Sequence, residues 1–112
     1  MITAVLFVVA AGAGALARGE AGRRWNREGR LPLGTLLVNV SGSFLLGLLW
    51  GVAPPASTVL GTGALGAFTT FSSFSREVVA LVEEGRRTTA AAYVAASCGF
   101  GLAAAAAGLA LS

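Results

Sequence analysis

The sequence GAFTTFSSFSRE occupies residues 66–77, inside an apolar run long enough to cross a membrane. It gathers five hydroxyl side chains and three phenylalanines. Such a polar segment is tolerated at membrane depth only where it is packed in protein or lines a water-filled path. The stretch therefore predicts a helix broken in mid-membrane, where carbonyl and hydroxyl oxygens are freed to bind an ion.

Outward from this stretch, four apolar runs cover most of the 112 residues. Each run approaches the roughly 20 residues that a helix needs to cross about 30 Å of hydrocarbon. We expect one all-α domain over 1–112, with membrane helices over about 2–18, 33–52, 58–82 and 88–111. Hydrophobic residues make up 55% and charged residues 12%, which excludes an ordinary soluble domain. The runs do not alternate in polarity, so they are not barrel strands.

The arginines are distributed unevenly over the short connections. All eight basic residues are Arg: five lie at 18–30, around the first connection, and Arg86 and Arg87 lie in the third. The second connection and both termini carry none. The positive-inside rule places the first and third connections in the cytoplasm and both termini outside a bacterial-type plasma (inner) membrane. The pI of about 10.5 thus indicates membrane flanks and not nucleic-acid binding.

Small residues are frequent, with 16 Gly and long Ala tracts. They allow close helix packing in lipid, and Gly47-Leu-Leu-Trp-Gly51 is a GxxxG motif of that kind. A four-helix unit of this size has little interior of its own, so we expect an oligomer.

Polar side chains recur at helical spacing on three of the expected helices. Asn39 and Ser43 lie four residues apart, as do Tyr93 and Ser97, while the third run contributes Ser72 and Ser73. All of them can donate hydrogen bonds. The alternatives are hydroxyls that bond back to their own helix, an Asn39 that joins two helices, and a Tyr93 in an interfacial belt.

Phe71 and Phe74 lie three residues apart and share a helix face. The edge of an aromatic ring is positive, so two rings presented edge-on favour an anion. Their alternative role is packing. Because no carboxylate stands in the middle of a span, the donors and ring edges suit a small hydrated anion that moves between weak sites. Arg18 is either an attractor in the vestibule or a snorkelling interface anchor.

Three other classes of function fit the sequence less well. A proton-coupled antiporter of cationic drugs needs a membrane-embedded carboxylate, but Glu20 lies past the first run and Glu77 near the end of the third. A structural membrane subunit would not need aligned donors. An enzyme is not expected, because the chain has no His, a single Cys98 and no acid–base cluster.

Three motifs together resemble the Fluc (CrcB) fluoride channel family. They are GAGALAR at 12–18, PLGTLLVNVSGSFLLG at 32–47 and GAFTTFSSFS at 66–75. The resemblance covers the whole chain. It implies passive fluoride export that relieves fluoride toxicity, through an antiparallel dimer with two pores.

The resemblance also implies roles for individual residues. Carbonyls of the broken third helix, at Gly66 and Thr69, would hold a structural Na⁺ at the dimer centre. By the same resemblance, the edge-on rings are Phe71 and Phe74, the pore amide is Asn39, and the fourth-helix polar track is Tyr93 and Ser97. The next position of that track, commonly Ser or Thr, falls on Gly101.

The arginine bias bears on the kind of dimer. An antiparallel homodimer requires a subunit that inserts both ways, and so a nearly balanced charge distribution. This chain has seven Arg on one side and none on the other. We therefore expect a partner that is a homologous subunit of opposite topology, with a homodimer as the alternative.

Overall fold

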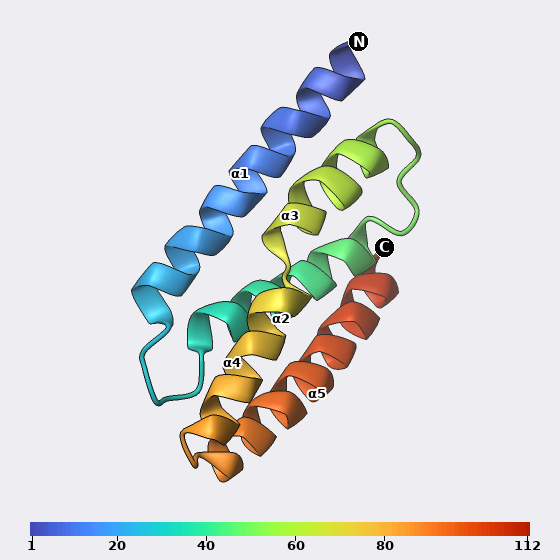
Figure 1. Cartoon of the computed structure of the whole chain (residues 1–112). Helices are drawn as coiled ribbons and strands as arrows, with labels where there is room; N and C mark the ends of the chain where they lie inside the picture. Colours follow the sequence, from blue (N-terminus) through green and yellow to red (C-terminus); the bar gives the residue numbers. More distant parts are fainter.

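The computed structural model describes residues 1–112, and all its regular elements are helical (Figure 1). They are α1 (Ile2–Trp25), α2 (Leu33–Leu48), the π-helical η1 (Thr58–Leu65), α3 (Gly66–Phe68), α4 (Phe71–Glu83) and α5 (Arg87–Leu111). By length and composition, α1 and α5 are apolar enough to cross a membrane, and α2 is a shorter apolar helix. The all-α architecture is confirmed. The four spans as such stay a prediction.

α1 continues beyond its expected end at Arg18 as far as Trp25. Glu20 explains this, because its Oε1 pairs with Arg23 Nη2 and with Arg24 Nε, each at 2.6 Å. Pairs three and four residues apart support a helix where the apolar pattern has ended. The hydrogen bonds from Arg23 and Arg24 lower the pKa of Glu20 to about 2, so this carboxylate stays ionised.

α2 ends at Leu48, before the expected end at residue 52, because residues 49–51 form turns and not helix. A Cβ on Gly51 would meet nothing within 4 Å, so this glycine packs against no other helix within the chain, and its packing role stays a prediction. Gly47 packs instead against α5, where its Cβ would lie 2.6 Å from the Ala105 carbonyl oxygen. A Cβ on Gly108 would likewise collide with the Phe44 carbonyl. The backbones of α2 and α5 are thus in direct contact.

Little of the apolar surface is covered within the chain. Only 16 of the 112 residues are buried, and the largest fully buried side chains are Tyr93 and Val38. Large side chains on the outer faces of α1 and α5, such as Leu16 and Leu102, remain exposed. Lipid or another subunit must therefore cover them, because water would not tolerate so large an apolar surface.

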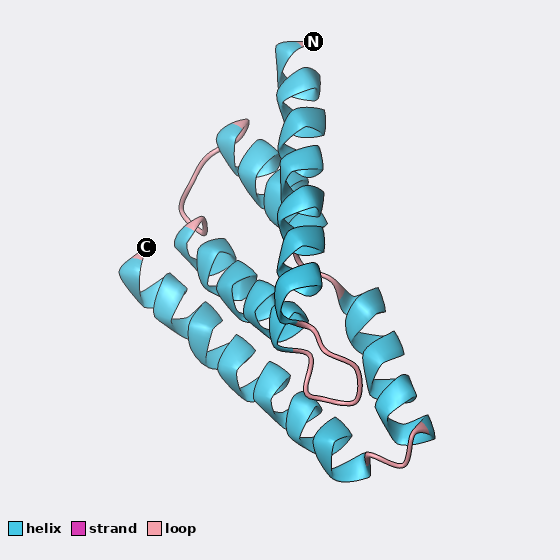
Figure 2. Cartoon of the chain, turned by 90° about the vertical axis from the view of Figure 1, so that its left-hand side faces the viewer, coloured by secondary structure: helices cyan, strands magenta, loops and turns pink.

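The first and third connections lie at the same end of the molecule, and the N-terminus and second connection lie towards the other (Figures 1 and 2). Gly29, with φ of 70°, brings the first connection against Arg86 of the third. A Cβ on this glycine would be 2.9 Å from Cζ of Arg86. Both arginine-rich connections therefore share one surface.

Candidate functional site

The helical path is interrupted between α3 and α4. Thr69 (φ −74°, ψ 156°) and Thr70 (φ −151°, ψ 119°) are extended, and the chain resumes a helix at Phe71. Thr70 begins the new helix as its N-cap, because its Oγ1 accepts a hydrogen bond of 3.1 Å from the amide of Ser73. That this interruption lies in mid-membrane stays a prediction.

The side chain of Asn39 on α2 stabilises the extended backbone at the interruption. Its Oδ1 accepts from the backbone N–H of Thr70 at 2.8 Å, and its Nδ2 donates to the Thr70 carbonyl at 3.0 Å. The side-chain amide of Asn39 thus takes the place of both backbone hydrogen-bond partners that Thr70 would have in a helix. Asn39 therefore joins two helical segments, which is the alternative considered for it, and one Nδ2 hydrogen remains free for an ion.

The carbonyls of Gly66 and Thr69 are among those that lose their helical donors at this point. In an α-helix, the amide of Thr70 would donate to Gly66 and that of Ser73 to Thr69. Here the Thr70 amide donates to Asn39 and the Ser73 amide to Thr70 Oγ1. The oxygens of Gly66 and Thr69 are therefore free of these donors and available to another partner.

A hollow of about 370 Å³ lies beside the interruption, between α2, α4 and α5. It brings together five residues of the predicted ion path, namely Asn39, Ser43, Phe71, Phe74 and Ser97, with Thr69 of the predicted Na⁺ site, and the rest of its lining is Leu46, Thr70 and Cys98. Ser72, which also belongs to the predicted set, lies next to it with its Oγ 3.4 Å from Thr70 Oγ1. Residues from three helices thus converge on one space.

The aromatic rings form a short series along this hollow. The centroids of Phe71 and Phe74 are 6.0 Å apart with planes tilted by 41°, and Phe74 lies 5.1 Å from Tyr93 at 57°. Phe71 is 79% exposed, so it is not a packing residue within this chain.

The hydroxyls divide into two groups. Ser41, Ser43 and Ser75 donate back to carbonyls of their own helices at 2.6, 2.8 and 2.9 Å. For these residues the alternative of internal bonding holds. On α5, by contrast, Tyr93 Oη and Ser97 Oγ are buried without a hydrogen bond of standard geometry, and the polar groups that face Tyr93 Oη are Thr35 and Glu77. Tyr93 is 0% exposed, so an interfacial belt position is wrong for it.

A second polar cluster was not anticipated from the sequence. Thr35 Oγ1 donates to Glu77 Oε2 at 3.0 Å, and Asn26 Nδ2 donates to Thr35 Oγ1 at 3.0 Å. Asn26 follows directly on α1, so Glu77 lies towards the arginine-rich end of the molecule. The second carboxylate oxygen of Glu77, Oε1, is buried without a hydrogen-bond partner. These residues are far apart in sequence and no local pattern connects them.

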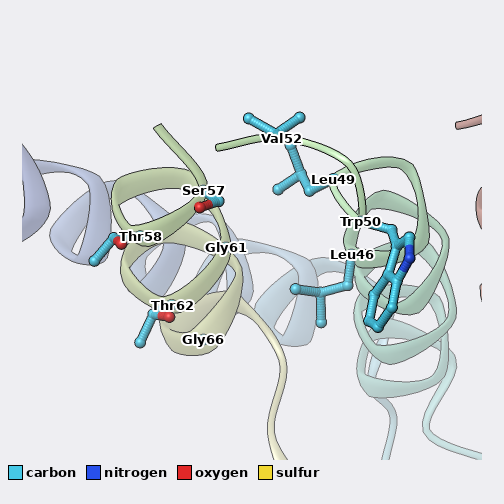
Figure 3. A pocket seen from close by; sticks show the side chains of 9 residues that line it. All are labelled: Leu46, Leu49, Trp50, Val52, Ser57, Thr58, Gly61, Thr62 and Gly66. Atoms are coloured by element: carbon cyan, nitrogen blue, oxygen red, sulfur yellow. The ribbon is translucent and has the colours of Figure 1, made fainter. Parts of the chain in front are cut away.

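Other predicted residues lie outside the hollow. Gly66 lines a separate hollow of about 520 Å³ between the end of α2 and η1, across from Leu46 and Trp50 (Figure 3). Arg18 is half-buried on α1 and pairs with no carboxylate. A Cβ on Gly101 would stand 3.9 Å from Ser43 Oγ, so this glycine does face the polar helices.

Comparison with known proteins gives a consistent result. Residues 5–109 match the family described as "CrcB-like protein, Camphor Resistance (CrcB)". The chain is 47% identical over 87 residues to a fluoride-specific ion channel FluC of Rhizobium meliloti (strain 1021), covering 71% of this chain and 70% of that one. It is 46% identical over 107 residues to FluC 1 of Geobacillus kaustophilus, covering 89% and 91%. With FluC of Anaeromyxobacter sp. (strain K), identity is 52% over 73 residues, and the match spans 59% of this chain and 58% of the relative.

Proposed function

This chain belongs to the CrcB-like protein family, and from that premise we propose that it is a fluoride-specific ion channel that exports fluoride passively from the cytoplasm. The family is one of ion channels, so the chain is not an enzyme. The proposed ion path follows the hollow beside the interruption and continues along α5.

The observation that carries the proposal is the pair of unpartnered hydroxyls on α5. A buried donor without an acceptor costs about 1–3 kcal/mol, so proteins rarely retain one. Tyr93 Oη and Ser97 Oγ lie one helical turn apart beside the phenylalanine series. An anion that accepts from each in turn would satisfy both donors.

The remaining groups suit the same ion. The free Nδ2 hydrogen of Asn39, the hydroxyl of Ser72 and the ring edges of Phe71 and Phe74 are all weakly positive. None of the residues around the hollow is cationic, so no site holds the anion tightly. Ser43 donates its hydroxyl hydrogen to the Asn39 carbonyl and lines the path. Arg18 is proposed to attract fluoride at the vestibule.

Tyr93→Phe tests this path, because it removes one hydroxyl and nothing else. A hydrogen bond to a charged group contributes about 1.5–3 kcal/mol, so fluoride efflux from liposomes is expected to fall by at least about tenfold. Thermal stability should be unchanged or higher, since the lost donor was unpaired.

Ser41→Ala is the matched control, because Ser41 donates to the Leu37 carbonyl on an exposed face. Its efflux should equal that of the wild type. Wild-type efflux in Tyr93→Phe would remove this hydroxyl from the path. Chloride efflux, measured in parallel, reports any general leak.

We further propose that the working unit is an antiparallel dimer. The 79% exposure of Phe71, the open hollow and the small buried core all support an additional subunit. The partner is proposed to be a homologous subunit of opposite topology, because the arginines gather at one end. A homodimer is the alternative.

Orientation is the measurement that separates these two assemblies. Epitope tags at each terminus should both be accessible from the outer side of the inner membrane. The reason is that seven Arg favour one orientation of the chain in this membrane. Tags found on both sides in one population would instead indicate a chain that inserts both ways and pairs with itself.

Na⁺ is proposed to bind at the interruption, near the centre of the dimer. Interrupted helices bind Na⁺ through unwound carbonyls, and the carbonyls of Gly66 and Thr69 fit because both have lost their helical donors. No His, Cys or carboxylate cluster competes for a metal. When bound, the ion would be coordinated by these oxygens in place of the lost donors, and would stabilise the extended conformation of Thr69 and Thr70.

A further inference from the structure

A basic hollow lies at the end of α1, away from the proposed ion path. Its volume is about 480 Å³, and its lining consists of Arg24, Trp25, Arg27, Arg30, Leu31 and Leu33. Three arginines thus line a space that also has an apolar side. No part of the proposed fluoride path uses these residues.

The positive charge around this hollow is not neutralised within the chain. Glu20 is shared between Arg23 and Arg24, while Arg27 and Arg30 have no carboxylate within 4.0 Å. The intervening Glu28 is exposed and forms no ion pair. The surface therefore carries guanidinium groups that attract an anion from outside.

The third connection adds to this charge. Arg86 lies against Gly29 in the middle of the first connection, and its own carboxylate contact, with Glu84, is long at 3.8 Å. Folding thus brings cations of two connections together. Such crowding is unfavourable unless an anion is bound between or beside them.

The hollow also lies where a membrane helix gives way to a polar connection. Trp25, 49% exposed, ends α1, and Leu33, 50% exposed, begins α2. Tryptophan favours the level of lipid head groups. Guanidinium groups bind phosphate through paired, charge-assisted hydrogen bonds, and an exposed leucine beside them suits an acyl chain.

We propose that this hollow binds the phosphate of an anionic phospholipid, such as phosphatidylglycerol. Arg27 and Arg30 hold the phosphate, Trp25 packs against the glycerol region and Leu33 contacts the acyl chain. A lipid suits the apolar side of the hollow, which a free phosphate ion would leave uncovered. The inference goes beyond channel function and requires only that the chain be embedded in a bilayer.

The two tryptophans provide a test, because Trp25 lines the hollow and Trp50 lies past the opposite end of α2. Trp50→Phe leaves Trp25 as the sole reporter, and Trp25→Phe leaves Trp50. Each variant is reconstituted in phosphatidylcholine vesicles with a minor fraction of phosphatidylglycerol. Bromine is placed on the chains of one lipid or, at the same mole fraction, of the other.

Brominated phosphatidylglycerol should quench Trp25 at least twofold more than brominated phosphatidylcholine, and should quench Trp50 equally. Arg27→Gln with Arg30→Gln, in the Trp50→Phe background, should abolish the difference. Arg23→Gln is the matched control, because Arg23 pairs with Glu20 and does not line the hollow. It should preserve the difference.

Three outcomes would overturn the proposal: equal quenching of Trp25 by both lipids, the same enrichment at Trp50, or loss of the enrichment when inorganic phosphate is added. The last would assign the site to free phosphate. Fluoride efflux is measured on the same vesicles. Absent efflux with lipid enrichment retained, also after reconstitution together with a homologous subunit of opposite topology, would count against the channel and not against the lipid site.

Discussion

Asn39→Asp is expected to lower fluoride efflux by about two orders of magnitude or more. Part of the loss is structural. Asn39 donates through Nδ2 to the Thr70 carbonyl and accepts through Oδ1 from the Thr70 amide. A carboxylate retains the acceptor but has no donor, so one of its oxygens would face the carbonyl of Thr70. The extended segment that separates α3 from α4 would lose one of its two supports.

The larger part is electrostatic. Asn39 lines the same hollow as Phe71 and Phe74, and a carboxylate there would repel fluoride. Two unit charges about 4 Å apart at an effective dielectric constant near 20 interact by about 4 kcal/mol, which corresponds to nearly three decades in rate. Asn39→Ala separates the two effects, because it removes the support without adding charge.

The measurement is efflux from liposomes read with a fluoride electrode, with circular dichroism to check helix content. Asn39→Ala should conduct less than the wild type and more than Asn39→Asp. Equal efflux in the wild type and in Asn39→Asp would place the amide outside the ion path.

The four apolar runs and the interrupted third run were predictable because each depends on local composition. GAFTTFSSFS combines small and hydroxyl residues within an apolar run, and the structure adds Thr70 as the N-cap of the helix that follows. The predicted polar residues also meet, since spacing of three and four residues fixes their helix faces. Asn39, Ser43 and Ser97 accordingly line one hollow.

What the sequence did not show depends on tertiary contacts. Helix length in α1 is set by the ion pairs of Glu20, which an apolar pattern does not include. Gly47 packs against α5, whereas Gly51, the second glycine of the GxxxG motif, contacts no other helix within the chain. The cluster of Thr35 with Glu77 joins residues 42 positions apart. Whether a hydroxyl bonds to its own helix, as in Ser43, or stays free, as in Ser97, likewise depends on the neighbouring helix.

Removal of Na⁺ is the second change with a large expected effect. The carbonyls of Gly66 and Thr69 have lost their helical donors to Asn39 and to Thr70 Oγ1. In a membrane no water replaces those donors, and each unsatisfied carbonyl costs several kcal/mol. An ion that binds only the folded protein stabilises it by about 2.7 kcal/mol at a hundredfold excess over its Kd. Purification in N-methyl-D-glucamine chloride at matched ionic strength should therefore lower both thermal stability and fluoride efflux, and added Na⁺ should restore them.

Asn39→Ala supplies the control for this effect. Without the amide, the N–H of Thr70 is free to return to the Gly66 carbonyl, so one ligand of the ion acquires a protein donor. The dependence of thermal stability on Na⁺ concentration should then be weaker than in the wild type, whereas Ser41→Ala should retain it in full. A wild-type protein that is equally stable and equally conductive with and without Na⁺ would contradict the site. A Na⁺ dependence that persists unchanged in Asn39→Ala would assign the ion to carbonyls other than that of Gly66, because only that one regains its donor in the variant.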